Sequence, residues 1–404
     1  MKIKRQKLKP LVLIIASLFI FSCNRTVKKE EYLKKVYENL RDMESASYSV
    51  RVESWAPFDT IPSLVTHLYT IEMDNPLDTT IGASYVKFTD DRERVKWIYD
   101  GHMSATFFHE HKGVIIDSFK IDRGLEFRPL SAPFFNNTRS IIHYILTTED
   151  SISLSFQDVD SAYYYRLKIF EDRQVEFFGK AYHMPENPYN MGETTSQYEL
   201  WMDKKTNLPN RVRRKMSHDI SVSAVSEVKI NTFKPEDFNA SIYLPDDYEY
   251  REWGTRKKKA TGNPLEGKAA ADWTLQSTEN KDISFNELDS KLVLLQFTSV
   301  SCGPCRVSIP FLNGLTEEYS REQLEVIAIE CTTKSLRALQ HYREVNKISY
   351  PLLQSGGNIK KDYQISSFPG FFLIDENRNI VHVSKGFAEG QTDASIYKII
   401  QEHL

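Results

Sequence analysis

The sequence predicts two folded parts, a mainly antiparallel β domain over residues 31–248 and an α/β domain over residues 267–404. Segments of the first part alternate polar and apolar residues, the period of a strand with one face against a core. Aromatic residues, which suit strands, make up 12% of the chain, and most of them precede residue 260. In the second part, Leu292–Phe297 and Val326–Ile329 are nearly continuous apolar runs, which indicates strands buried on both faces of a sheet.

The N-terminal part is expected to be one sheet covered by one or two helices, because a sheet with one apolar face needs a cover. A helix predicted to begin at residue 31 has Leu33, Val36 and Leu40 on one face, and a second helix is predicted over residues 138–146. The predicted strands are 47–52, 68–73, 81–88, 94–99, 163–170, 175–181, 198–202, 211–215 and 221–230.

The segment of residues 198–214 carries a resemblance to a known family. A strand ends in Trp201-Met202-Asp203, a turn leads to Pro209, and a later Leu244-Pro245 closes the region. This pattern resembles the LolA-like lipoprotein-carrier fold, an open half-barrel whose concave face is closed by helices. The resemblance implies that residues 31–248 hold a lipid or another hydrophobic ligand on that face. The alternative is that the face is ordinary packed core.

Residues 1–22 have the pattern of a lipoprotein signal peptide. Five basic residues stand among the first nine, the apolar segment Leu11–Phe21 follows, and Ser22 precedes Cys23. The apolar segment is too short to span a bilayer as a stable helix. A small residue followed by Cys resembles a bacterial lipobox, which implies cleavage before Cys23, a lipid on its thiol and a tether over residues 23–30. A plain signal peptide or an uncleaved anchor is the alternative.

A linker is predicted between the two domains, and the sequence after it predicts the layout of the second domain. Residues 249–266 are basic, contain glycine and lack periodicity, which predicts a linker. The element order after residue 267 is βαβα and then ββα, which predicts a central mixed sheet flanked by helices. A net charge of −3 argues against a nucleic-acid partner, which usually requires a basic face. The predicted helices are 305–319, 335–345 and 392–403, and residues 371–374 and 380–383 form a predicted hairpin.

Two of the four cysteines form a C-G-P-C motif, Cys302-Gly303-Pro304-Cys305, where a buried strand turns into a helix. Unpaired N–H groups and the dipole at a helix start favour a thiolate, so this placement lowers the pKa of Cys302. Pro304 at an early helical position costs no hydrogen bond and stiffens the turn. The spacing lets the two sulfurs form a disulfide. The prediction is a two-step exchange, in which Cys302 attacks a partner disulfide and Cys305 resolves the mixed disulfide.

The strand, the C-G-P-C motif and the element order together resemble the thioredoxin fold. More narrowly, with Pro310 and Phe368-Pro369, residues 265–404 resemble the TlpA/ResA-like exported thiol-disulfide oxidoreductases. The resemblance implies that Pro369 is cis and faces the disulfide. It also implies that the backbone of Phe368, with Gly303 and Pro304, binds the substrate chain. Protein disulfide substrates, a membrane electron donor and no cofactor beyond the redox-active cysteine pair follow from the same resemblance.

Three residues depart from the family pattern. Ser301 stands where Trp is common, Gln296 where thioredoxins have a buried Asp, and Ser308 where ResA-like members have Glu. Deprotonation of Cys305 needs some base, or water. We assign this role to Glu330, at the end of the second buried strand, where its side chain can point beneath the motif. The alternative is a partly exposed carboxylate at the end of a strand.

No metal site is predicted. The chain has no second C-x-x-C and no His near the first, whereas a structural zinc site takes four ligands. The His109-Glu110-His111 stretch is interpreted as a polar loop rather than a metal cluster. Cys331 is interpreted as a small buried hydrophobe rather than a third reactive thiol.

The sequence therefore predicts a lipoprotein of the bacterial cell envelope that faces the periplasm, in either the inner or the outer membrane. Its predicted activity is thiol-disulfide exchange through Cys302 and Cys305, in the direction of a reductase. The alternative is an envelope lipoprotein that binds a hydrophobic ligand or a partner and carries an auxiliary thioredoxin-like domain. A thiol peroxidase is a third possibility, which the C-G-P-C pair disfavours.

Overall fold

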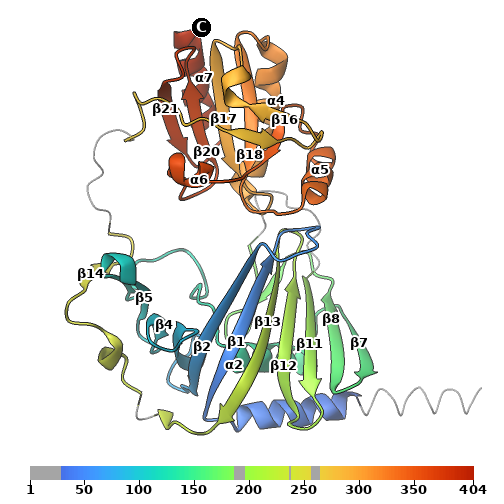
Figure 1. Ribbon diagram of the computed structural model, residues 1–404. Helices are drawn as coiled ribbons and strands as arrows, with labels where there is room; N and C mark the ends of the chain where they lie inside the picture. The colour runs from blue at the N-terminus through green and yellow to red at the C-terminus, as the bar shows by residue number, and fades with distance from the viewer. Residues whose placement is uncertain (1–28, 186–195, 236–237, 256–263) are drawn as a thin grey trace, which may run out of the picture.

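A computed structural model describes residues 29–185, 196–235, 238–255 and 264–404 (Figure 1). Cys23 and the predicted signal peptide lie outside these ranges. A large curved sheet forms the N-terminal domain, and a smaller α/β domain lies over one end of it (Figure 1). None of the helices in the described ranges has the length and apolar character needed to cross a bilayer.

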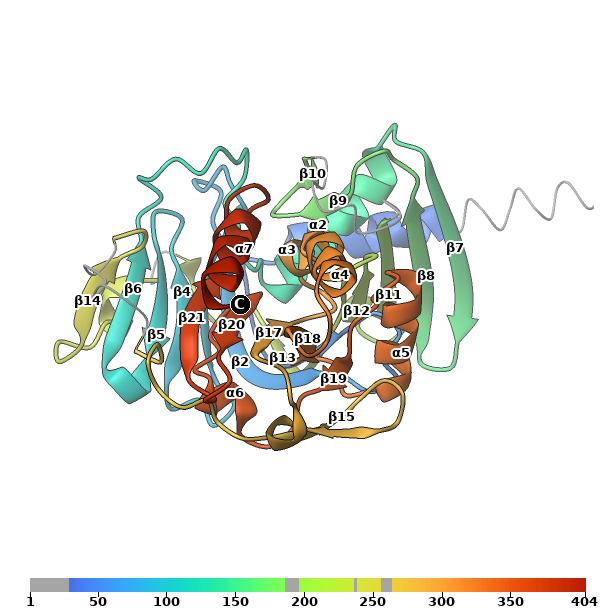
Figure 2. The ribbon, with the colours of Figure 1, turned by 90° about the horizontal axis from the view of Figure 1, so that it is seen from above.

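The N-terminal sheet has twelve strands in the order β14-β6-β5-β4-β3-β2-β1-β13-β12-β11-β8-β7. Neighbouring strands are antiparallel, except that β14 and β6 are parallel. Seen from above, the sheet curves around α2 and the β9–β10 hairpin (Figure 2). The strands are β1 (Ser45–Trp55), β2 (Leu64–Asp74), β3 (Ala83–Thr89), β4 (Val95–Tyr99), β5 (Ser104–Phe108), β6 (Gly113–Asp117), β7 (Ile152–Val159), β8 (Ala162–Ile169), β9 (Val175–Phe177), β10 (Ala181–His183), β11 (Ser196–Asp203), β12 (Leu208–Lys215), β13 (Ile220–Ile230) and β14 (Glu249–Glu252).

Two helices cover part of the concave face of this sheet. The described part of the first spans residues 29–41, and its predicted apolar face is buried. The second, α2 (Phe134–Thr147), begins four residues before the predicted start at residue 138, and buries Ile141 and Ile142. Both helices pack into one core with side chains of β8, β11 and β12. The prediction of a strand-rich domain with one or two helices is confirmed, whereas its likeness to the LolA-like half-barrel stays a prediction.

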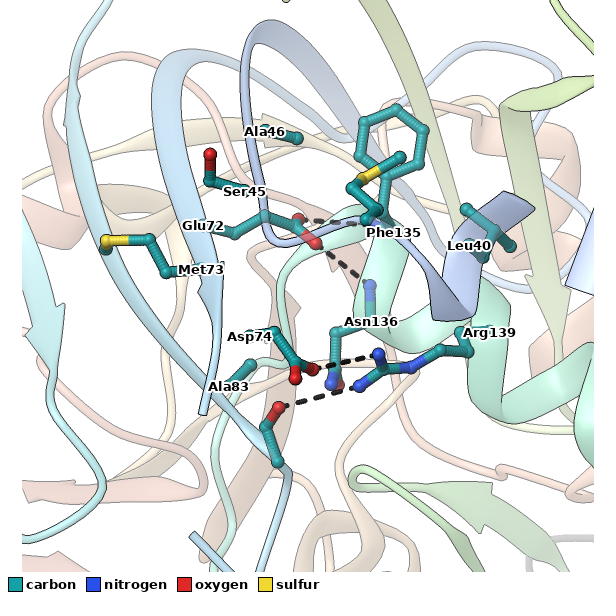
Figure 3. Close-up of a pocket in the computed structure, with 12 residues that line it drawn as sticks. Leu40, Ser45, Ala46, Glu72, Met73, Asp74, Ala83, Phe135, Asn136 and Arg139 are labelled. Atoms are coloured by element: carbon teal, nitrogen blue, oxygen red, sulfur yellow. Dashed lines mark hydrogen bonds and ion pairs between the residues drawn. The ribbon is translucent and has the colours of Figure 1, made fainter. Parts of the chain in front are cut away.

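The buried carboxylate of Glu72 on β2 holds the start of α2. Pro133 precedes this helix and gives it no side-chain cap, so its first N–H groups need another acceptor. Glu72 accepts the backbone N–H groups of Phe135 and Asn136 at 3.1 and 3.0 Å (Figure 3). The Tyr48 hydroxyl donates to the same carboxylate. The adjacent pocket, of about 20 Å³, has room for little more than one water molecule. Glu72 therefore fixes the helix to the sheet.

Four strands of the sheet were not predicted, namely β5, β6, β7 and β14. The strand β14 lies inside the predicted linker of residues 249–266 and pairs with β6 through its backbone. Its side chains are largely exposed, so it carries no alternating apolar pattern. The strand β7 does alternate, with Ile152, Leu154 and Phe156 packed toward the core, and this signal was available in the sequence.

The C-terminal domain has a five-stranded mixed sheet in the order β19-β18-β17-β20-β21. β17, β18 and β19 are parallel, and β20 and β21 are antiparallel to their neighbours. Alternate residues of β17 enter two cores, one covered by α4, α5 and α7 and the other by β15, β16 and α6. The predicted mixed sheet flanked by helices is confirmed. The elements are β15 (Thr274–Gln276), β16 (Asp282–Ser284), β17 (Leu292–Thr298), α3 (Gly303–Val307), α4 (Ile309–Glu318), β18 (Leu324–Glu330), α5 (Leu336–Val345), β19 (Leu352–Gln354), α6 (Ile359–Asp362), β20 (Gly370–Ile374), β21 (Ile380–Lys385) and α7 (Thr392–His403), with short 3-10 turns at His109–His111, Ala240–Tyr243 and Phe285–Glu287.

The helix after the cysteine motif is broken. The sequence predicts one helix over residues 305–319, but the chain forms α3 and α4 with a break at Ser308. Pro310 stands in the first turn of α4 and has no N–H, so it cannot continue the hydrogen-bond ladder of α3. The break leaves α3 as a single short turn that carries the cysteine pair.

The loop between β1 and β2 joins the two domains. Ala56 belongs to a core cluster of the C-terminal domain, and the Phe58 ring packs on His341 with ring centroids 4.4 Å apart. The hydroxyl of Thr333 donates to the carboxylate of Asp59. Thr333 follows the end of β18, so the carboxyl ends of the parallel strands β17 and β18 face the N-terminal domain (Figure 1).

We expect Ile141→Ala to lower the free energy of unfolding of the N-terminal domain by about 2–5 kcal/mol, because it leaves a cavity where α2 meets the sheet. Urea denaturation followed by circular dichroism measures this change. Thr147→Ala on the exposed face of the same helix is the control, expected within about 0.5 kcal/mol of the parent chain. Equal effects of the two substitutions would contradict the assigned packing of α2.

Candidate redox site

Two parallel strands bring the site together. β17 and β18 pair with Thr298 opposite Glu330, so both chains leave the sheet at the same edge. The chain leaving β17 makes a turn in which the Cys302 N–H donates to the Ser299 carbonyl at 3.0 Å, and then enters α3. The turn after β18 is anchored to the end of β17, because the N–H of Cys331 donates to the Thr298 carbonyl at 3.0 Å.

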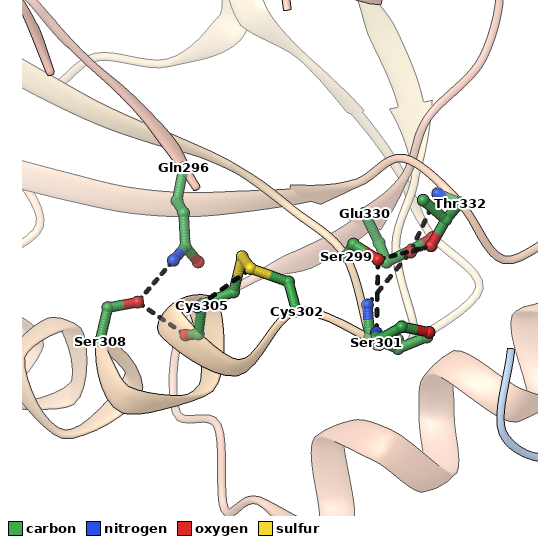
Figure 4. Close-up of a disulfide and its surroundings, with 9 residues drawn as sticks. Gln296, Ser299, Ser301, Cys302, Cys305, Ser308, Glu330 and Thr332 are labelled. Atoms are coloured by element: carbon green, nitrogen blue, oxygen red, sulfur yellow. Dashed lines mark hydrogen bonds between the residues drawn. A yellow bond between two sulfur atoms is a disulfide. The ribbon is translucent and has the colours of Figure 1, made fainter. Parts of the chain in front are cut away.

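The two cysteines of the motif form a disulfide with their Cα atoms 5.3 Å apart (Figure 4). Cys305 is 1% exposed, whereas Cys302 is half-buried and is the sulfur that a partner can reach. The N–H of Cys305 donates to the Cys302 sulfur at 3.2 Å. An N–H donor of this kind stabilises negative charge on the sulfur. The outer sulfur is therefore prepared to act as nucleophile or leaving group, and the inner one is shielded.

Gln296 and Ser308, the two neutral residues at the positions of the family acids, contact each other. The Gln296 amide donates to the Ser308 hydroxyl at 2.7 Å, and that hydroxyl donates to the Cys305 carbonyl at 2.7 Å (Figure 4). Both side chains are buried. The space beside Cys305 is thus filled by a hydrogen-bonded pair that does not titrate in the physiological range.

Glu330 is fully buried at the end of β18. This burial does not fit the alternative interpretation of Glu330 as a partly exposed carboxylate at the end of a strand. Its carboxylate accepts backbone N–H groups of Val300 at 3.4 Å, Thr332 at 2.9 Å and Thr333 at 2.8 Å, and also the Thr332 hydroxyl. Burial raises the pKa of Glu330 to about 7, although these donors pull it down. Its partners among the described residues are in the turns before Cys302 and after β18, and neither sulfur is one of them (Figure 4).

The Phe368–Pro369 peptide bond is cis. β20 begins at the next residue, and Gly370 pairs with Phe297 near the end of β17. The Pro369 carbonyl accepts the Gly386 N–H at 2.8 Å, which ties this segment to the end of β21. Phe368 is half-buried against the core on the other face of the sheet, and Gly303 and Pro304 are half-buried at the start of α3.

Cys331 lies apart from the cysteine pair, on the opposite face of the sheet. It packs with the core formed by β15, β16 and α6, whereas α3 and α4 lie on the other face. Its sulfur approaches the Ile329 carbonyl at 3.4 Å. Burial raises the pKa of Cys331 to about 12, so the thiol stays protonated and unreactive at neutral pH. Cys331 therefore packs as a small hydrophobe, as interpreted from the sequence, but it is partly rather than fully buried.

His109, the first residue of the His109-Glu110-His111 stretch, has hydrogen-bond partners at both ring nitrogens. One ring nitrogen of His109 contacts the Tyr248 hydroxyl at 2.8 Å and the other contacts the Val95 carbonyl at 2.6 Å. Ligand atoms of Asp150, Glu171 and His183 lie within 4.8 Å of one another, a grouping that the sequence did not suggest. An ion-pair contact of 2.8 Å between His183 and Asp150 accounts for much of that proximity.

The concave face of the N-terminal sheet also holds a cavity of about 850 Å³. The sequence left open whether this face is packed core or a ligand site, and the structure shows packed core over one part of the face and a cavity over the rest. The helices fill one part of the face, and side chains of β1 to β5, β12 and β13 line the open remainder. No single segment predicts the cavity, because its walls come from residues spread over the whole domain.

A mixed sheet of this order, with C-G-P-C after a buried strand and a cis X-Pro bond directly before β20, defines a thioredoxin-like redox domain. The sequence profile of the AhpC/TSA family matches residues 267–383. Thioredoxin-like protein YneN of Bacillus subtilis is 30% identical over 134 residues, which cover 33% of this chain and 78% of YneN. Two proteins named thiol-disulfide oxidoreductase ResA are also similar. The ResA of Bacillus thuringiensis is 28% identical over 121 residues, which cover 30% of this chain and 69% of that protein. The ResA of Halalkalibacterium halodurans is 29% identical over 136 residues, which cover 33% of this chain and 75% of that protein. Through its C-terminal domain, the chain belongs to the thioredoxin-like thiol-disulfide oxidoreductases.

We expect Cys331 to resist alkylation in the folded chain, because it is partly buried and its raised pKa keeps the thiol protonated. Iodoacetamide at pH 7, with the labelled peptides identified by mass spectrometry, should modify Cys331 slowly before denaturation and rapidly after it. Reduced Cys302 in the same sample is the internal control and should react first. Equal rates at Cys331 and Cys302 would show that Cys331 is a reactive third thiol.

Proposed function

We propose that this thiol-disulfide oxidoreductase works as a reductase of protein disulfides in the bacterial cell envelope. The supporting observation is the asymmetry of the cysteine pair, with Cys302 accessible and Cys305 buried behind it. An oxidising compartment supplies disulfides as substrates, and a dithiol donor in the membrane restores the reduced pair. Lipidation of Cys23, inferred from the lipobox pattern, would hold the chain at the membrane.

The exchange has two steps. The Cys302 thiolate attacks one sulfur of the substrate disulfide, that disulfide breaks, and the other substrate sulfur leaves as a thiol after taking a proton. Cys305, as a thiolate, then attacks the Cys302 sulfur of the mixed disulfide. The Cys302–Cys305 disulfide forms and the second substrate thiol is released. The substrate gains two electrons and two protons, and the cysteine pair loses both.

Glu330 is the residue we assign to proton transfer in this exchange. Gln296 and Ser308 offer no carboxylate near Cys305, so the proton of the buried thiol needs another acceptor. A pKa of about 7 suits a group that both takes and returns protons near neutral pH. Its contacts are with the turn before Cys302, so we propose that it acts through an intervening water molecule rather than directly on sulfur.

The substrate chain would bind along the edge formed by Phe368 and the start of α3. In this proposal the backbone of Phe368 pairs with an extended substrate segment, while Pro369 places that backbone beside the disulfide. Gly303 and Pro304 border the same edge with small side chains that leave the Cys302 sulfur approachable.

A second function, carriage of a hydrophobic ligand by the N-terminal domain, is favoured by the cavity on its concave face. About 850 Å³ lies within the range of natural small-molecule sites. Its lining combines aliphatic and aromatic side chains with serine and threonine hydroxyls and a few charged groups. This function would accompany the redox activity rather than replace it.

We expect Cys302→Ser to abolish the reduction of insulin disulfides by the full chain, because the attacking sulfur is lost. Cys305→Ser should instead accumulate a mixed disulfide with the substrate, because Cys302 still attacks but nothing resolves the adduct. Turbidity measures insulin reduction and non-reducing electrophoresis detects the adduct. Substantial turnover by Cys302→Ser would overturn the assignment of the nucleophile.

We expect the rate of thiol exchange by the parent chain to rise with pH through about 7, as the Glu330 carboxylate loses its proton and becomes a base. Glu330→Gln should lower the rate at pH 8 by about 10²-fold and remove this inflection. Glu325→Gln is the matched control, since Glu325 is a second buried glutamate on β18 and lies at the opposite end of the strand. An unchanged pH profile in Glu330→Gln would exclude the proposed proton transfer.

A further inference from the structure

The cavity of the N-terminal domain has an apolar wall that continues to the surface. Val50 and Val52 of β1 and Leu68 of β2 line it beside one another on neighbouring strands. Leu64 and Trp97 also line it and are 59% and 36% exposed. An apolar chain entering past these two residues would therefore stay in contact with apolar groups along its path. Burial of such a chain is the main source of affinity in sites of this kind.

The two cationic side chains that line the cavity, Arg214 and Lys87, differ in their ion-pair partners. Arg214 pairs with Glu176 and with Asp219, at 2.7 Å in the second case, so this cation is compensated. Lys87 on β3 also lines the cavity, but its ammonium donates to the Ser131 carbonyl and hydroxyl at 2.9 and 3.3 Å. Among the described residues, no carboxylate lies within ion-pair distance of it.

Lys87 lies on the wall of the cavity and is half-buried. By strand register it lies between Thr70 of β2 and Trp97 of β4, both of which line the cavity. The Tyr85 ring lies 4.7 Å from its ammonium. The nearby carboxylate of Glu72 is occupied by Tyr48 and by the start of α2. Burial lowers the pKa of Lys87 to about 8, so the ammonium keeps most of its charge at pH 7.

We propose that this cavity binds a long-chain fatty acid, with its carboxylate paired to Lys87 and its hydrocarbon chain along Val50, Val52 and Leu68. The inference deepens the ligand-carrying function proposed above and is independent of thiol exchange. The half-buried ammonium of Lys87 has lost part of its hydration and has no carboxylate partner among the described residues, so a bound carboxylate would offset that cost.

The charge balance favours a carboxylate over a phosphate headgroup. One ammonium and one serine hydroxyl offer a single positive charge and one further donor. A phosphate monoester carries between one and two negative charges and is best matched by the forked donors of arginine. The arginine of the cavity, Arg214, is already paired with two carboxylates.

Equilibrium dialysis of the delipidated full chain against palmitate and against hexadecanol tests the inference, because the two probes share a chain and differ in charge. We expect the parent chain to bind palmitate at least about tenfold more tightly than hexadecanol. Lys87→Met should remove this preference and leave the affinity for hexadecanol unchanged, which also shows that the variant is folded. Lys87→Arg should keep the preference.

Two controls and one competitor complete the test. Lys96→Met removes a neighbouring lysine on β4 that does not line the cavity, and it should bind palmitate as the parent chain does. Cys302→Ser should also bind normally, so a failure of the redox proposal is separable from a failure of this one. Equal affinity for palmitate and hexadecanol, or no effect of Lys87→Met, would overturn the inference. Tighter Lys87-dependent binding of dioleoyl phosphatidate than of palmitate would overturn the choice of a carboxylate.

Discussion

The parallel pairing of β17 and β18 is the constraint on which the redox site depends. Because Thr298 stands opposite Glu330, the turn that leads to Cys302 and the turn that follows β18 leave the sheet side by side. The Glu330 carboxylate fills the space between the turns and accepts backbone N–H groups from both. A shift of one residue in the register would point Glu330 to the other face, where Cys331 lies. Strand register thus decides which side chain supports the cysteine turn.

The neutral pair beside Cys305, Gln296 and Ser308, avoids the cost of burying a charge. An isolated acid at either position would be buried and would need a partner or a proton. The Gln296 amide instead donates a hydrogen bond to the Ser308 hydroxyl, and this hydroxyl donates to the Cys305 carbonyl. The two departures from the family pattern are therefore one structural change. It ties the turn that carries Cys305 to β17 and leaves no ionisable side chain at either position.

The sequence predicts the C-terminal domain well because each of its signals is local. Buried parallel strands give continuous apolar runs, and C-G-P-C marks the start of a helix. What it missed depends on long-range contact. The hydrogen bond between Gln296 and Ser308 joins residues on two elements. The residues of β14 form a strand because they pair with the backbone of β6. Alternation likewise shows that β1 to β3 have an apolar face, but cannot show that Val50 and Leu68 face an open cavity whereas Ile141 is packed.

The cavity and the redox site share the loop between β1 and β2. Thr333 uses its N–H to hold Glu330 at 2.8 Å and its hydroxyl to contact Asp59 in that loop. Five residues after Asp59, Leu64 begins β2 and forms part of the cavity entrance. The residue that positions the buried acid is therefore bonded to the segment that borders the ligand path. The N-terminal domain therefore contacts the residue that holds Glu330, and the edge of the sheet that leads to Cys302 faces this domain.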